Sequence, residues 1–412
     1  MFPMLKNAAC RTMVCLALLG TSLGCASAAP REYSFLDTRS VAATLAQVRD
    51  GEERIQPAVR ALLREADVVL HQEIPPLTIK PALPPSGDPH DYYSLSPYWW
   101  PDSTKPDGLP YVRRDGRVNP ERETIRDREF LRKVYSSVET LTLAYALSGK
   151  EDYAKAAVRI LRQWFVNPET RMNPSLTFAQ IVRGNKKPRG AGIIEGRGMI
   201  ILAASLDLLF ASPHLTASDR TALTGWLRAY YQWLHESPQG KDEIDAPNNH
   251  GSWYDAQRVT IAWTLRDTAG AKRIAEEALT LRIASQIEPD GRQPQELRRT
   301  RALHYSTFNL MALFALASVA ERVGVDMWTF VTPDGRSIRK ALDWLAPYAT
   351  GKSVWPYEQI GEYEPDFFYE LLLRAAVVYK DEHYRLLAES MKGIDTRTHR
   401  GILLHPEALR TP

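Results

Sequence analysis

The chain has 412 residues and carries 52 Lys and Arg against 49 Asp and Glu, a formal net charge of +3. With 44% hydrophobic and 25% charged residues, the composition is that of a folded protein and excludes a disordered chain. The charge balance and the lack of a dense basic run predict no nucleic-acid partner. A polyanionic ligand would have to be bound by a local basic patch, because the field of the whole protein is weak.

The N-terminus has the three parts of a secretory signal peptide. Lys6 and Arg11 form a positive segment, residues 13–20 are apolar, and Ala26-Ser27-Ala28 has the small residues of a cleavage site. The apolar core is too short for a transmembrane helix. We therefore predict that residues 1–28 are a signal peptide and that the protein is periplasmic or secreted.

The cysteines allow a second interpretation of this end of the chain. Leu23-Gly24-Cys25 resembles the end of a lipoprotein signal, which would leave a lipidated Cys25; we rank this second. The other two cysteines, Cys10 and Cys15, also precede residue 28, so cleavage leaves no thiol for a disulfide or for catalysis. We predict that no later segment is apolar enough to span a membrane.

Beyond residue 50 the apolar residues recur mostly at helical spacing. In 152–165, the positions i, i+3, i+4, i+7 and i+8 from Tyr153 are apolar, which makes one buried face of an amphipathic helix. Strand-like alternation is scarce and no clear linker appears. We predict an all-α fold of stacked helical hairpins in one domain over 29–412. The predicted helices cover 53–71, 122–148, 152–165, 192–210, 216–234, 252–267, 270–287, 302–322, 336–348 and 365–379.

Residues 74–120 interrupt the helical pattern. They hold 11 of the 28 prolines, few periodic apolar positions and a dense block of aromatic residues at 92–100. A loop of this length inside a compact domain is usually functional. Two further polar loops are predicted over 183–192 and 238–247, and the second leads into an Asn-Asn-His segment.

That segment, Asn248-Asn249-His250, is the first candidate for chemistry. Pro247 and Asn248 mark a helix start, after which His250 and Tyr254 share one helical face. A structural interpretation stays open, in which an asparagine only caps the helix and His250 is a satisfied polar residue.

The second candidate is a basic run that ends in a tyrosine. Arg298 and Tyr305 are seven residues apart, which predicts two turns on one helical face with Arg301 between them. The run could be a solvated basic face. Against this, an arginine would lower the pKa of a nearby phenol, which would make Tyr305 usable for proton transfer.

Two weaker candidates concern sugar binding. Sugar rings stack on exposed indoles, so Tyr98, Trp99 and Trp100 suit a carbohydrate subsite, although most tryptophans are largely buried in cores. Glu195 and Arg197 could form an ion pair, or Arg197 could contact a substrate carboxylate.

The sequence lacks the motifs of several other enzyme classes. It contains no HExxH, no clustered His and Asp and no EF-hand spacing. Neither a G-x-S-x-G elbow nor a phosphate-binding glycine loop occurs. We therefore predict no metal site and no cofactor.

The order of these pieces resembles the alginate lyase family. Asn249-His250, followed downstream by Arg298 and Tyr305, is similar to the family's Asn-His pair and its Arg and Tyr seven residues apart. The long segment 96–121, which begins Ser-Pro-Tyr-Trp-Trp-Pro-Asp, looks closer to the branch that acts on mannuronan and glucuronan. The resemblance extends from about residue 75 to about 360.

The resemblance implies a fold and a reaction. The fold would be an incomplete (α/α) toroid with long active-site loops. The reaction would be a metal-independent β-elimination on an anionic 1,4-linked uronate polymer, in which Asn249 and Arg298 neutralise the carboxylate beside the C5 proton. Substrate would also be bound by Trp99, Trp100, Arg197, Tyr254, Arg301 and Tyr357.

The proton-transfer groups depend on the sugar. In mannuronate or glucuronate the C5 proton and O4 lie on the same side, so Tyr305 would act as both base and acid. In guluronate they lie on opposite sides, so His250 would be the base and Tyr305 the acid.

Two other functions remain open at this point. A glycoside hydrolase would need two carboxylates flanking the bond, and Glu195, Asp255 and Glu358 form no compelling pair. A non-catalytic periplasmic polysaccharide-binding protein would keep the aromatic and basic residues but would not need Tyr305.

Overall fold

The computed structural model describes residues 36–185 and 187–409, and helices make up most of this part of the chain. The predicted signal peptide and the alternative lipidation at Cys25 lie outside the described residues. The helices are α1 Thr38–Arg49, α2 Gln56–Leu70, α3 Asp127–Ser148, α4 Glu151–Leu161, α5 Met199–Leu209, α6 Ala217–Glu236, α7 Pro238–Ile244, α8 Asn249–Thr264, α9 Thr268–Ala278, α10 Pro294–Leu297, α11 Ala302–Ala320, α12 Ile338–Ala349, α13 Asp366–Tyr379, α14 Glu382–Glu389 and α15 Gly401–Leu404.

Every predicted helix is present, which confirms the all-α interpretation. The stripe at 152–165 forms α4 and a following π-turn, Arg162–Val166, because its apolar face packs on α3. The short helices α1, α7, α10, α14 and α15 were not predicted, since most are too short for a clear apolar stripe.

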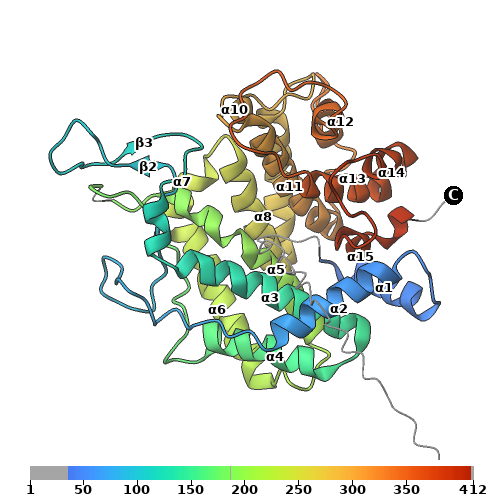
Figure 1. The fold of residues 1–412 in the computed structure, drawn as a ribbon, viewed down its shortest axis with the longest axis horizontal. Coiled ribbons are helices and arrows are strands. Elements are labelled where there is room, and N and C mark those ends of the chain that lie inside the picture. The colour runs from blue at the N-terminus through green and yellow to red at the C-terminus, as the bar shows by residue number, and fades with distance from the viewer. Residues whose placement is uncertain (1–35, 186, 410–412) are drawn as a thin grey trace, which may run out of the picture.

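The helices form an arc of hairpins (Figure 1). Neighbours along the inner side are α3, α5, α8, α11 and α13, and each of α4, α9, α12 and α14 packs outside an inner helix. The arc ends meet where α15 contacts α1 and α2. There Arg400 donates to Glu65 and Glu139, at 2.7 and 2.9 Å, which ties the C-terminal segment to the first helices.

Helix α11 lies inside the arc and has buried, mostly apolar residues on all sides. Together with the following turn it covers Ala302–Val323, a stretch long and apolar enough to cross a membrane by length and composition. The expectation that no such segment exists is therefore wrong. The structure buries 83% of the apolar window, as in the core helix of a globular protein.

The hydrophobic core has two clusters of buried residues, and α8 contributes to both. Tyr254 and Ile261 belong to the cluster around α2–α6, whereas Trp253 and Val259 belong to the cluster around α9–α14. Opposite faces of α8 thus pack against the two halves of the arc. The single domain over 29–412 stays a prediction.

The long segment 74–120 contains three of the four short strands. Strand β1, Tyr93–Leu95, pairs in parallel with β4, Phe178–Ile181. Strands β2, Trp99–Trp100, and β3, Val112–Arg113, form a hairpin that projects from the arc at the left of Figure 1. The segment therefore carries its aromatic residues to one side of the helices.

Candidate active site

A cavity of about 1160 Å³ lies within the arc and brings most of the candidate residues together. Its lining takes residues from the start of the β2–β3 hairpin, from α7 and α8, and from the turn into α11. Six of the ten predicted site residues line it: Trp99, Arg197, Asn249, His250, Arg301 and Tyr305. The four outside the lining are Trp100, Tyr254, Arg298 and Tyr357.

Asn249 begins α8 and is fully buried. Asn248 is the cap, since its side chain accepts from the His250 backbone N–H at 3.0 Å, so capping does not explain Asn249. The backbone N–H and the Nδ2 of Asn249 both donate to the Glu296 carboxylate, at 2.7 and 2.8 Å. Because Nδ2 carries two hydrogens, one N–H is left for a substrate carboxylate.

Glu243 orients the imidazole of His250. Glu243 lies on α7, is buried, and places Oε2 2.9 Å from Nδ1 of His250. An ionised carboxylate at this position keeps the proton on Nδ1 and leaves Nε2 to accept one. Sequence reasoning missed Glu243, although it lies in the predicted loop that leads into His250.

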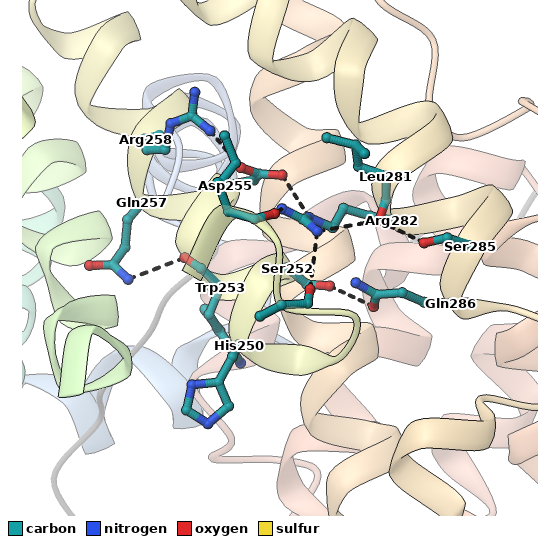
Figure 2. A network of polar contacts seen from close by, with 12 residues as sticks. His250, Ser252, Trp253, Asp255, Gln257, Arg258, Leu281, Arg282, Ser285 and Gln286 are labelled. Atoms are coloured by element: carbon teal, nitrogen blue, oxygen red, sulfur yellow. Dashed lines mark hydrogen bonds and ion pairs between the residues drawn. The ribbon is translucent and has the colours of Figure 1, made fainter. Parts of the chain in front are cut away.

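Arg282 holds the start of α8 in place, as Figure 2 shows. Its Nε donates to Asp255 at 2.7 Å, and its two terminal nitrogens donate to the backbone carbonyls of Ile244 and Ala246, at 2.8 and 3.2 Å. A Cβ at Gly251 would lie 2.3 Å from the backbone carbonyl oxygen of Ala246 and 2.6 Å from Nη1 of Arg282, so a glycine is needed there. This network connects the end of α7 to the first turns of α8, which carry His250.

Tyr305 lies in the first turn of α11, and its side chain is buried. Its hydroxyl lies 2.7 Å from the hydroxyl of Tyr98, and the Arg299 guanidinium carbon lies 3.6 Å from its ring centroid. Burial raises the pKa of the phenol above its ordinary value, Tyr98 adds to this, and Arg299 offsets only part. An arginine thus lowers this pKa as the sequence predicted, but burial outweighs its effect, and Tyr305 is protonated in the free protein.

The arginine beside Tyr305 is Arg299 and not Arg298. Helix α11 begins only at Ala302, and its N-cap Arg301 has non-helical φ −124° and ψ 55°. The predicted helical face shared by Arg298 and Tyr305 is therefore wrong. Arg298 is exposed, lies outside the cavity lining and donates to Gln295 at 3.4 Å.

Asp115, two residues after β3, holds Arg299 against Tyr305. Its carboxylate accepts from Nε and Nη2 of Arg299, at 3.0 and 2.8 Å, and from the backbone N–H of Thr300 at 3.1 Å. Burial opposes ionisation, but the bonds from Arg299 outweigh it and hold the pKa of Asp115 at about 2. This ion pair thus persists through neutral and mildly acidic pH.

We expect Asp115→Asn to lower kcat/KM about tenfold on the uronate polymer that the resemblance implies, because an amide cannot accept all of these bonds and Arg299 loses its fixed position. Initial rates at several substrate concentrations test this. The control is Asp334→Asn, which removes an exposed partner of Arg336 on another face. Equal rates in Asp115→Asn and the unmodified protein would show that Arg299 needs no such support.

Arginines dominate the charge of the cavity. Nine arginines and six acidic residues line it, so the local basic patch expected for a polyanionic ligand is present. Burial and the neighbouring guanidinium groups lower the pKa of His304 to about 4, so His304 is neutral at neutral pH. Burial lowers the pKa of Arg197 to about 9, which still leaves Arg197 charged.

The aromatic candidates separate into those inside and those outside the cavity. Trp99 lines it, with the Arg189 guanidinium carbon 5.2 Å from its ring centroid. The Tyr254 hydroxyl is buried and donates to the Leu234 carbonyl at 2.6 Å, because Tyr254 faces the core and not the cavity.

Trp100 and Tyr357 also have other surroundings. The Trp100 indole donates to the Arg117 carbonyl at 3.0 Å, across the β2–β3 hairpin. Tyr357 packs with Trp344 and Trp355, at ring-centroid distances of 6.3 and 5.2 Å. Their predicted contacts with substrate are therefore not supported by their positions.

Within residues 36–185 and 187–409, no group of three or more His, Cys, Asp or Glu side chains is arranged to hold a metal ion.

Comparison with known proteins identifies the family. The model of the family described as alginate lyase matches residues 76–355. This chain belongs to the alginate lyase family. Membership assigns it to the polysaccharide lyases, as the resemblance predicted, and a search of the curated proteins found no significant match.

Solved structures of alginate lyases have the same fold. An alginate lyase from Bacteroides ovatus is 36% identical, with a TM-score of 0.85 over 90% of this chain and 98% of that one. Alginate lyase A1-III from Sphingomonas species A1 is 16% identical, with a TM-score of 0.61 over 92% of this chain and 96% of that one. The predicted toroid of helical hairpins is thereby confirmed.

Proposed function

We propose that this alginate lyase family member cleaves 1,4-linked polyuronates, either alginate rich in mannuronate or glucuronan, by β-elimination. The observation that carries the proposal is the position of the protonated Tyr305 phenol in one cavity with Asn249, His250 and Arg299. Variants of the related A1-III enzyme have been crystallised with a tetrasaccharide, which is in keeping with a chain-like sugar substrate.

The proposed first step is removal of the C5 proton. This proton is weakly acidic because the neighbouring carboxylate is already an anion. The remaining Nδ2 hydrogen of Asn249 and the guanidinium of Arg299 would bind that carboxylate and stabilise the enolate-like intermediate. Arg299 takes the role that the sequence assigned to Arg298, because Arg299 lies at the cavity and beside Tyr305.

The second step breaks the bond from C4 to O4, forms the C4–C5 double bond and protonates O4. The buried, protonated Tyr305 is the proposed acid.

The base of the first step depends on the sugar. On guluronate, Nε2 of His250 would take the C5 proton. On mannuronate or glucuronate, Tyr305 would first give its phenol proton to water, then take the C5 proton as a phenolate and return that proton to O4. Arg299 against its ring is the group that favours the phenolate.

Ultraviolet absorbance during incubation of purified protein with polymannuronate, polyguluronate and glucuronan, with a chelator present, tests this proposal. The conjugated double bond formed by β-elimination absorbs, whereas hydrolysis creates none. We expect absorbance to rise on polymannuronate or glucuronan. New reducing ends without absorbance would establish a hydrolase instead. Neither signal, together with retained binding of a polymer, would favour the non-catalytic binding protein.

We also propose that the protein is exported to the periplasm or secreted, on the basis of the signal-peptide pattern in residues 1–28. Cell fractionation, with the mass of the mature N-terminus, tests this. A mature chain that begins at residue 29 is expected. A chain that begins at a lipidated Cys25 would establish the lipoprotein alternative.

A further inference from the structure

A second group of cations lines the cavity, on elements that carry neither His250 nor Tyr305. Arg122 lies on the 3-10 helix η1, Pro120–Thr124, and Arg128 and Arg132 lie one turn apart on α3. Figure 1 places α3 in the lower half of the molecule and α10 and α11 in the upper half. These arginines, which we call the α3 arginine group, thus form a different part of the cavity wall from Arg299.

The nearest buried carboxylate to the α3 arginine group is already engaged. One oxygen of Glu195 accepts from the hydroxyls of Tyr92 and Ser94, at 2.8 and 2.6 Å. The other lies 3.3 Å from Nε of Arg128 and also accepts from Gln180. Both oxygens of Glu195 are therefore engaged, and no hydrogen bond from Arg122 to Glu195 is among the contacts of this carboxylate with the described residues.

The arginines of the group also repel one another. Burial and the charge of Arg128 lower the pKa values of both Arg122 and Arg132, the second to about 10. The Arg122 side chain is only 9% exposed, and its salt bridge runs from Nε to Glu123, whose side chain is 65% exposed. Among the described residues, Nη2 of Arg122 has no hydrogen-bond partner. A buried donor that lines a cavity needs a hydrogen-bond partner there, which is water in the free protein and can be a ligand in a complex.

We propose that the α3 arginine group is a second carboxylate-binding subsite, which binds a uronate residue of the same polymer chain away from the bond that is cleaved. This inference rests on the proposed function for the nature of the polymer. A carboxylate among these guanidinium groups would receive charge-assisted hydrogen bonds, including one from Nη2 of Arg122, and would relieve the repulsion between like charges. Only oligomers long enough to reach both sites would use it.

Calorimetric binding of size-fractionated oligomannuronates and oligoglucuronates to the full chain with Tyr305→Phe tests the subsite without turnover. Adding Arg122→Gln is expected to weaken the binding of the longest oligomers about tenfold and to leave dimers unchanged. Arg132→Gln should behave in the same way and replaces Arg122→Gln if that variant does not fold. The control is Arg126→Gln, an exposed arginine of the same segment that pairs with Glu129.

Equal affinities with and without Arg122 at every length would overturn the subsite. Equal weakening at every length, dimers included, would also overturn it, because the arginine would then act at the catalytic centre. Absorbance with the unmodified chain and the same oligomers separates the two proposals. Length-dependent binding without any turnover would remove the lyase proposal and leave the subsite in place.

Discussion

Replacing Tyr305 with phenylalanine is expected to lower kcat on the cleaved polymer by roughly 10²–10⁴-fold, the usual range for general acid–base catalysis. The phenol is the buried, protonated group beside Arg299, and the substitution removes only its hydroxyl. The ring and its contact with the Arg299 guanidinium remain, so the dissociation constant for an oligomer should change by only a few-fold. Ultraviolet rates and calorimetric binding measure the two effects separately.

Tyr98→Phe is the matched control for this prediction. It removes the same 2.7 Å hydrogen bond between the two hydroxyls but leaves Tyr305 its proton. We therefore expect a much smaller loss of kcat than in Tyr305→Phe. Equal losses in the two variants would mean that the hydrogen bond, and not proton transfer from Tyr305, explains the effect.

The largest expected effect on stability comes from Asp255→Ala. Asp255 is 2% exposed and accepts from Arg282 at 2.7 Å and from Arg258 at 3.0 Å (Figure 2). Removing the carboxylate leaves two buried guanidinium groups without their shared partner. Breaking a buried pair in this way lowers the free energy of unfolding by about 3–5 kcal/mol. Urea denaturation followed by far-ultraviolet circular dichroism measures the change.

Asp290→Ala is the control for burial. Asp290 pairs with Arg292, but both side chains are about half exposed, at 49% and 48%, so water can replace the lost partner. The expected change in the free energy of unfolding is below about 1 kcal/mol. Similar values for Asp255→Ala and Asp290→Ala would show that the network around Arg282 does not stabilise α8.

Local sequence patterns were sufficient to predict the long helices, but not the short ones. The apolar positions of 152–165 recur with the period of the α-helix, and each residue in such a stripe lies near the others in the chain. The same local patterns also identified Asn249, His250 and Tyr305, because two short segments hold all three. The family resemblance placed these segments in one toroid.

The sequence by itself determined the helical hairpins and the family, and it proposed Asn249, His250 and Tyr305, which the structure places in one cavity. Only the tertiary structure decided which groups surround them. Helix α11 begins at Ala302, so the chain turns before it and directs Arg299 rather than Arg298 toward Tyr305. The contact of Tyr98 with Tyr305 joins residues 207 apart, and that of Asp115 with Arg299 joins residues 184 apart. The spacing of apolar residues depends only on residues that are close in the chain. The long-range contacts depend on how the packed helices and the β2–β3 hairpin are positioned relative to one another.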